Sequence, residues 1–131
     1  MEGRIFMNKQ LKISFLDWWL WYDPKNNFFV DLFRDIYGDV EVVEPHEADI
    51  LFFGPYSDSH KSFDKDKIIK IFYTPENARP NFDDCTYSFS FDYDDYDGRN
   101  IRLPLWFIEL DWYNKRGYNN PEFLLPLDKI P

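Results

Sequence analysis

The sequence is poor in the residues that build covalent cross-links and metal sites. Its 131 residues include one cysteine, Cys85, and two histidines, His46 and His60. A single cysteine excludes a disulfide within the chain and is typical of a reducing compartment. Neither histidine lies near Cys85 in the sequence, and residues 44–47 lack a second histidine at metal-ligand spacing. We therefore predict no metal site and interpret Cys85 as a small buried hydrophobic residue.

Positive charge and glycine are also scarce. The 15 Lys and Arg residues are outnumbered by 24 Asp and Glu residues, which gives a formal net charge of -9. This balance argues against a site for nucleic acid or nucleotide phosphates and is compatible with a neutral sugar. The sequence likewise has no glycine-rich phosphate-binding loop, and no cluster of Lys and Arg follows residue 107.

Long hydrophobic runs are missing at the start of the sequence. The first nine residues contain no apolar stretch long enough for a signal peptide or a membrane anchor. We therefore expect a cytoplasmic protein without a membrane segment.

Aromatic residues, by contrast, make up 21% of the chain, and such side chains dominate the packing of protein cores. The length suits one domain with its own core. Apolar runs bounded by turn residues predict strands at 11–16, 40–43, 49–54, 68–73 and 86–91. Together with one helix, this order predicts an α/β fold with an open, mostly parallel, Rossmann-like sheet flanked by helices.

The predicted helix covers residues 25–37, because its aromatic and aliphatic residues recur at helical spacing. We expect Asp23 to cap its N-terminus, Pro24 to occupy its first turn and Gly38 to end it. The residues predicted to face the core are Phe28, Phe29, Leu32, Phe33 and Ile36.

A group of polar side chains follows the predicted strand at 68–73. Thr74-Pro75 ends this strand, because proline supplies no hydrogen-bond donor to a sheet. The side chains thereby delivered to the C-terminal edge of the sheet, where open α/β proteins bind ligands, are those of Glu76, Asn77, Arg79 and Asn81. They could bind a polyhydroxy substrate and remove one of its protons. They are also ordinary loop residues, so the residues alone leave both interpretations open.

Two further loops are expected at the same edge. The first strand ends at Trp18 and Trp19, whose indole rings either stack on a sugar or close the core under the helix. The strand at 49–54 opens into a loop that carries Tyr56 and Ser57. These two residues are candidates for sugar contacts, and a plain surface loop is the alternative.

Several sequence blocks occur together in one order. They are Asp17-Trp18-Trp19, then Phe72-Tyr73-Thr74-x-Glu76-Asn77-x-x-Pro80-Asn81-Phe82, then Tyr87-x-x-x-Phe91-Asp92, then Arg102-Leu103-Pro104-Leu105. Over residues 12–107 this order resembles the α-1,3/1,4-fucosyltransferases of glycosyltransferase family 10, in particular the acceptor-side, N-terminal domain of the bacterial members. Two departures are Asp17, where the family has asparagine, and Pro75, where those enzymes carry glycine.

The resemblance implies one half of a GT-B-type glycosyltransferase, with the active site in the cleft between two Rossmann-like halves. It implies inverting transfer of L-fucose from GDP-fucose to an N-acetylglucosamine-containing glycan such as N-acetyllactosamine, with Glu76 as the general base. The implied substrate-binding residues are Trp18, Trp19, Tyr56, Ser57, Asn77, Arg79 and Asn81. No cofactor or metal is expected on this chain, because GDP-fucose binds to the other half in this family.

These expectations divide the chain into an N-terminal extension at 1–10, the acceptor-binding domain at 11–110 and a linker at 111–131 toward a donor-binding domain. That domain is expected in cis or in trans, and the isolated chain is not expected to transfer fucose. The alternative is a free-standing, non-catalytic carbohydrate-binding or interaction module derived from the same domain. An exposed apolar patch near residues 103–107 would favour a partner domain.

Overall fold

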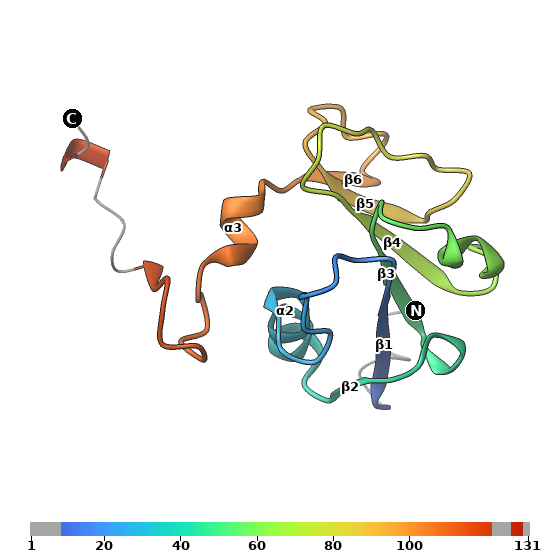
Figure 1. The fold of residues 1–131 in the computed structure, drawn as a ribbon, viewed down its shortest axis with the longest axis horizontal. Coiled ribbons are helices and arrows are strands. Elements are labelled where there is room, and N and C mark those ends of the chain that lie inside the picture. Colours follow the sequence, from blue (N-terminus) through green and yellow to red (C-terminus); the bar gives the residue numbers. More distant parts are fainter. Residues whose placement is uncertain (1–8, 122–126, 130–131) are drawn as a thin grey trace.

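Six parallel strands form one open sheet in the computed structural model, which describes residues 9–121 and 127–129 (Figure 1). The strands are β1 (Leu11–Leu16), β2 (Val40–Val42), β3 (Ile50–Phe53), β4 (Ile69–Tyr73), β5 (Tyr87–Ser90) and β6 (Asn100–Arg102). Their spatial order is β2-β1-β3-β4-β5-β6, and every neighbouring pair is parallel. The predicted α/β class and open parallel sheet are therefore confirmed.

The order of the strands reverses between β1 and β3. The chain proceeds from β1 outward to β2 and then crosses back to β3 on the other side of β1. In open α/β sheets the loops at such a reversal diverge, and ligands bind in the crevice at the C-terminal ends of the strands. Here Leu16 pairs with Phe53, and Phe53 pairs with Phe72. The loops after β1, β3 and β4 therefore leave the sheet side by side.

Helix α2 (Phe28–Tyr37) begins later than the sequence predicted. Asn27, rather than Asp23, is the N-cap, and its side-chain oxygen accepts a hydrogen bond from the Val30 amide at 3.1 Å. The Asp23 carboxylate instead accepts from the Lys25 amide at 2.9 Å, which makes a separate turn before the helix. Gly38 ends the helix as predicted, with a positive φ of 86°.

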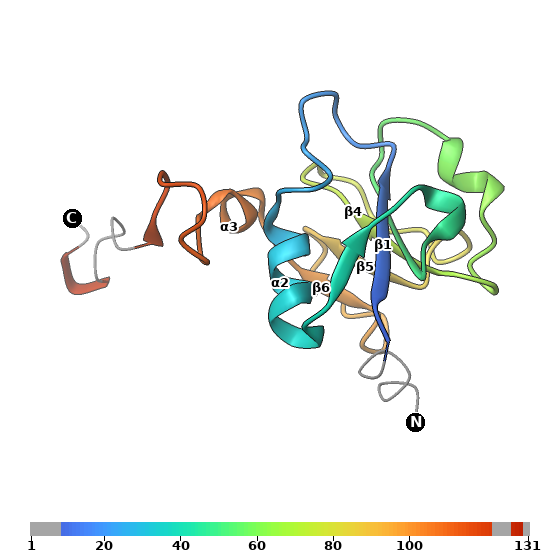
Figure 2. The ribbon, with the colours of Figure 1, turned by 90° about the horizontal axis from the view of Figure 1, so that it is seen from below.

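The face of the sheet under α2 carries the main core (Figure 2). Its buried side chains come from alternate positions of the strands, from α2 and from the residue after β6: Leu11, Ile13, Phe28, Phe29, Val30, Phe33, Val40, Ile50, Phe52, Ile71, Tyr73 and Leu103. The predicted aromatic stripe of the helix is confirmed at Phe28, Phe29 and Phe33. Ile36 was predicted in the core but is 60% exposed, because the last turn of the helix directs Tyr37 rather than Ile36 toward the core.

The opposite face is covered by 3-10 turns and loops instead of a long helix. The turns are η1 (Pro45–Glu47) and η2 (Ser59–Ser62). A small apolar cluster of Phe53, Phe72 and Cys85 lies on this face. Cys85 is fully buried, as predicted, and burial raises the pKa of its thiol to about 11. Its thiol is therefore protonated at neutral pH and a poor nucleophile.

A buried lysine attaches the η2 turn to this face. The Lys70 side chain is 2% exposed, and its ammonium group donates to the carbonyl oxygens of His60 at 2.8 Å and Phe63 at 2.9 Å. The His60 ring stacks on Phe53 with their centroids 4.0 Å apart. Burial lowers the pKa of both Lys70 and His60, and the lysine charge lowers that of His60 further.

The apolar residues around positions 101–107 belong to two elements. Asn100–Arg102 forms the edge strand β6, and α3 (Leu105–Glu109) follows Pro104. The sequence did not predict a sixth strand, because its three residues include only one hydrophobic side chain. A further turn, η4, covers Leu127–Lys129. Among the described residues, no helix is long and apolar enough to cross a membrane.

Residues after α3 fold back onto α2. Asp111 is 1% exposed and accepts hydrogen bonds from the backbone amides of Lys115, Arg116 and Gly117 at 2.8 to 3.1 Å. The Arg116 guanidinium pairs with Asp31 of α2 at 2.9 Å and with Asp111 at 3.5 Å. This ion-paired loop holds α3 beside α2, and both views show the two helices as neighbours (Figures 1 and 2).

Candidate functional site

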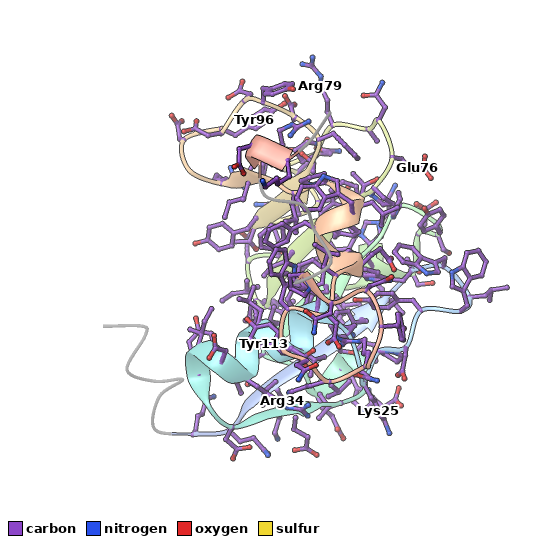
Figure 3. The ribbon with its side chains drawn as sticks, turned by 90° about the vertical axis from the view of Figure 1, so that its left-hand side faces the viewer. Lys25, Arg34, Glu76, Arg79, Tyr96 and Tyr113 are labelled. Atoms are coloured by element: carbon purple, nitrogen blue, oxygen red, sulfur yellow. The ribbon has the colours of Figure 1, made fainter. Side chains whose placement is uncertain are left out.

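Glu76 stands on the loop after β4, with its side chain directed outward (Figure 3). Its carboxylate accepts a hydrogen bond of 3.1 Å from the hydroxyl of Tyr56, which lies on the loop after β3. The backbone amide of Glu76 donates to the hydroxyl of buried Thr74 at 3.0 Å. The carboxylate is therefore exposed and held by one donor, and the backbone of Glu76 is anchored to Thr74, despite the proline at position 75.

Burial and the neighbouring carboxylate both raise the pKa of Tyr56. Its hydroxyl consequently stays protonated at neutral pH and remains a donor to Glu76. A carboxylate that is oriented by one donor and open to solvent can still accept a proton from a bound hydroxyl group. The geometry thus suits Glu76 to the role of a base.

Asp17 and Gly54 fix the loops after β1 and β3 relative to each other. Asp17 has a positive φ of 62°, a conformation that Asp and Asn adopt more easily than other side-chain-bearing residues. Its carboxylate accepts from the His60 amide at 2.8 Å, and its carbonyl oxygen accepts from the Tyr56 amide at 3.2 Å. A Cβ atom at Gly54 would lie 2.8 Å from that carbonyl oxygen, so only glycine fits there.

The tryptophans after β1 occupy different environments. Trp18 is stacked between Tyr22 at 4.2 Å and Tyr73 at 5.2 Å, and its indole N–H donates to the Phe52 carbonyl at 3.3 Å. Both faces of its ring are therefore covered by protein. Trp19 is half-buried, and its ring meets that of Tyr56 edge-on at 6.1 Å. Of the two predicted sugar contacts, Trp19 is the one placed beside the Glu76–Tyr56 pair.

Arg79 and Asn81, two other predicted contacts, interact with residues other than Glu76. Arg79 is exposed, and its Nε lies 3.8 Å from a carboxylate oxygen of Asp92. The Asn81 side chain accepts from the Asp83 amide at 3.0 Å and so caps the turn that leads to Cys85. Within residues 9–121, neither Asn77 nor Arg79 hydrogen-bonds to Glu76, so Tyr56 is the residue that orients the carboxylate.

Two clefts open beside this edge. One, the Trp21 cleft, has a volume of about 240 Å³ and is lined by residues that include Trp19, Trp21, Glu109 and Tyr118. The other, the His60 cleft, measures about 200 Å³ and is lined by residues that include Ser57, His60, Arg79 and Asn81. The predicted set is thus divided, with Trp19 on one cleft and Ser57, Arg79 and Asn81 on the other.

A search of the described residues finds no group of three His, Cys, Asp or Glu side chains arranged to hold a metal ion. The side chains that meet at this edge offer a carboxylate, a hydroxyl group and aromatic faces. Such groups recognise neutral polyhydroxy ligands.

Comparison with known proteins decides the family. Residues 13–109 match the family described as the alpha-(1,3)-fucosyltransferase FucT N-terminal domain. The chain belongs to this family. The match includes the loops after β1, β3 and β4 and ends with the last residue of α3.

Individual relatives agree with this assignment. The alpha-(1,3)-fucosyltransferase FucT of Helicobacter pylori is 30% identical to this fucosyltransferase domain in an alignment of 104 residues that covers 76% of the chain. A crystal structure of alpha1,3-fucosyltransferase with GDP-fucose superposes with a TM-score of 0.57 at 28% identity over 76% of the chain. A second crystal structure of alpha1,3-fucosyltransferase gives the same TM-score and identity.

The chain spans 22% of the length of its Helicobacter pylori relative and 28% of the chain solved with GDP-fucose. The similarity therefore concerns one part of those enzymes.

Two residues at the edge of this fucosyltransferase domain were missed from the sequence. Glu109 and Tyr118 line the Trp21 cleft together with Trp19 and Trp21. Glu109 is the last residue of α3, and Tyr118 comes from the segment predicted as linker, where no local pattern indicates that the chain folds back onto α2.

Proposed function

We propose that this chain is the acceptor-binding, base-carrying half of an inverting α-1,3/1,4-fucosyltransferase. The reaction is the transfer of L-fucose from GDP-fucose to an N-acetylglucosamine-containing glycan such as N-acetyllactosamine. The observation that carries the proposal is the exposed Glu76 carboxylate, held by the Tyr56 hydroxyl at the strand edge beside the reversal of strand order.

In this reaction the oxygen of an acceptor hydroxyl bonds to the anomeric carbon of fucose while the bond to the GDP phosphate oxygen breaks. The attacking hydroxyl becomes more acidic as its oxygen loses electron density to the new bond. Glu76 accepts its proton, and Tyr56 holds the carboxylate in position by donating to one of its oxygens. Donor binding is assigned to a separate domain, because the formal net charge of the chain is -9 and its sequence has no glycine-rich phosphate-binding loop.

Exposed apolar residues favour such a partner domain over an independent module. Leu105 is 37% and Trp106 is 57% exposed on α3, whereas Leu103 just before them is buried. Adjacent exposed apolar side chains of this size are typical of surfaces that contact another protein surface. The alternative, a non-catalytic carbohydrate-binding module, has no comparable observation in its favour.

The proposal is tested by titrating the purified chain with N-acetyllactosamine and, separately, with GDP-fucose while tryptophan fluorescence is recorded. We expect a change with the sugar and none with the nucleotide. Binding of GDP-fucose would overturn the assignment of the acceptor half, and a chain that binds neither ligand would contradict the proposal altogether.

The role of Glu76 is tested in a hybrid enzyme, in which residues 13–109 replace the matching segment of the Helicobacter pylori relative. Glu76→Gln removes the base but keeps the size of the side chain, so fucose transfer should fall about hundredfold or more. Glu41→Gln, on the exposed side of β2, is the matched control and should leave transfer unchanged. An undiminished rate in the Glu76→Gln hybrid would contradict the role as base.

A further inference from the structure

We infer that Lys70 is a positioning residue for the proposed base, Glu76, although Lys70 lies inside the opposite face of the sheet. It acts through a series of hydrogen bonds, the Lys70 relay, that runs from Lys70 to His60, Asp17, Tyr56 and Glu76. This inference rests on the proposed function, because it concerns what holds Glu76 in place for its role as a base.

The ammonium group of Lys70 is buried among neutral acceptors. Within the described part of the chain, no carboxylate forms a direct ion pair with it. Its three N–H bonds face three acceptors of one turn, which are the His60 carbonyl at 2.8 Å, the Phe63 carbonyl at 2.9 Å and the His60 Nδ1 at 3.4 Å. Burying a charge is costly unless polar groups surround it, and lysine is rarely buried for packing alone. The contacts of Lys70 therefore explain a lysine at this position, and they fix the η2 turn to β4.

The same turn is bonded to the loop after β1. The carbonyl oxygen of His60 accepts from Lys70, and the backbone amide of His60 donates to the Asp17 carboxylate at 2.8 Å. Burial lowers the pKa of Lys70, and the negative charge of Asp17 partly opposes this effect. Lys70 and Asp17 are thus joined through the backbone of one residue and also by the attraction of their charges.

Asp17 extends this constraint to the loop after β3. Its carbonyl oxygen accepts from the Tyr56 amide at 3.2 Å, and the close approach of Gly54 to the same oxygen leaves the loop little room to shift. The Tyr56 hydroxyl in turn donates to Glu76 at 3.1 Å. A hydrogen bond from the tip of a side chain is kept only while the backbone that carries it stays in place. The bond to Glu76 therefore depends on Asp17.

The Tyr56 loop has little burial to hold it. Tyr56 is 46% exposed, and its neighbours Pro55 and Ser57 are exposed as well. The Trp19 ring meets Tyr56 only edge-on, with the centroids 6.1 Å apart. Loops with few buried apolar contacts open easily unless hydrogen bonds hold them. We therefore expect a change at Lys70 to reach Glu76.

The first test looks for this effect in the whole chain. Lys70→Met keeps most of the side-chain length but removes the three N–H donors. In NMR spectra of the ¹⁵N-labelled chain it should shift the amide signals of Tyr56 and Glu76, although neither residue hydrogen-bonds to Lys70. Lys12→Met, at an exposed position of β1, is the matched control and should leave both signals in place. Unchanged signals of Tyr56 and Glu76 in Lys70→Met would overturn the inference.

The second test measures fucose transfer by the hybrid enzyme that carries residues 13–109, at a temperature at which every variant is folded. Lys70→Met should lower kcat about tenfold and leave the KM for N-acetyllactosamine unchanged, because the Glu76 carboxylate is displaced but still present. Tyr56→Phe removes the last bond of the relay and should lower kcat by a similar factor.

The double variant distinguishes positioning from a general effect on stability. If Lys70 acts through the hydroxyl of Tyr56, the variant with both Lys70→Met and Tyr56→Phe should be no slower than Tyr56→Phe alone. Two effects on kcat that multiply would show that Lys70 does not act through Tyr56, and would overturn the relay.

Asp17 offers a pair of variants that separate its side chain from its backbone conformation. Asp17→Asn keeps an oxygen acceptor for the His60 amide and tolerates the positive φ, so most of the rate should remain. Asp17→Gly tolerates the same φ but removes the acceptor, so kcat should fall about tenfold. Equal rates of the two variants would overturn the inference.

Failure of this inference and failure of the proposed function give different results. If Glu76→Gln strongly lowered transfer while Lys70→Met left kcat unchanged, the relay would be overturned and the role of Glu76 kept. If transfer were equally fast with and without the Glu76 carboxylate, the proposed function would fail and the relay with it.

Discussion

The two faces of the sheet are stabilised by different means. Under α2 the rings of Phe29, Phe52 and Tyr73 pack with centroids 5.2 to 5.5 Å apart in a cluster of hydrophobic side chains. On the opposite face the ammonium of Lys70 donates hydrogen bonds to the carbonyl oxygens of His60 in η2 and of Phe63 directly after it. The face under α2 is therefore stabilised mainly by hydrophobic packing, whereas the position of η2 on the opposite face depends on individual hydrogen bonds.

The difference continues to the C-terminal edge of the sheet. The Trp21 cleft adjoins α2 and has aromatic walls, whereas the His60 cleft adjoins Phe53 and Phe72 on the polar face. Glu76 and Tyr56 stand at the edge near both clefts, on the loops after β4 and β3. The proposed acceptor site thus takes its stacking surfaces from the hydrophobic face.

We expect the largest loss of stability when a buried phenylalanine is removed, and the loss should differ between the two faces. Phe29 is fully buried among five aromatic rings, so Phe29→Ala should lower the free energy of unfolding by about 3–5 kcal/mol. Phe72 borders the His60 cleft, so Phe72→Ala leaves a smaller enclosed cavity and should cost less than Phe29→Ala. Urea denaturation measures both values, and an equal or larger loss for Phe72→Ala would contradict the comparison.

Lys70 tests the polar face with a smaller effect. Lys70→Met keeps most of the side-chain volume but leaves the carbonyl groups of His60 and Phe63 without their donor. We expect a loss of about 2 kcal/mol in the free energy of unfolding. Lys12→Met, at an exposed position of β1, is the matched control and should change stability little. A neutral or stabilising Lys70→Met substitution would show that the ammonium does not hold the turn.

The smallest effect concerns pH and the two histidines. Burial and the charge of Lys70 lower the pKa of His60 below its usual value of 6.5 in the folded chain. At a pH between the lowered pKa and 6.5, the unfolded chain therefore binds a proton that the folded chain does not. Stability should therefore fall as the pH decreases from 7.5 to 5.5. His60→Gln should reduce this dependence, and His46→Gln, at an exposed position, should not. The test is the denaturation midpoint of each variant at the two pH values. If the midpoint changed equally with pH in His60→Gln and His46→Gln, the prediction would be contradicted.

The hydrophobic face was largely predictable from the sequence. Alternation and helical spacing place the first five strands within one or two residues, and they place Phe28, Phe29 and Phe33 in the core. These patterns are local, because a strand or helix presents the same face at a fixed spacing. The start of α2 was missed because Asp23 and Asn27 are equally good caps by residue type.

Contacts between distant residues were not predictable in the same way. The Asp31–Arg116 pair spans 85 positions of the sequence, and the Tyr56–Glu76 hydrogen bond spans 20. The sequence did place the loops of Tyr56 and Glu76 at one edge, since both follow parallel strands. Which hydroxyl reaches the carboxylate depends on the register of β3 and β4 and on the turn at Gly54, and neither leaves a local pattern.

The central claim is that an acceptor sugar binds where Glu76, Tyr56 and Trp19 meet. The most direct measurement is the change in backbone and indole NMR signals of the ¹⁵N-labelled chain as N-acetyllactosamine is added. We expect chemical-shift changes at Tyr56, Glu76 and the indole groups of Trp19 and Trp21, and no change in the signals of residues 60–70 on the opposite face. Shifts confined to the His60 cleft, or none at the Glu76 loop, would contradict it.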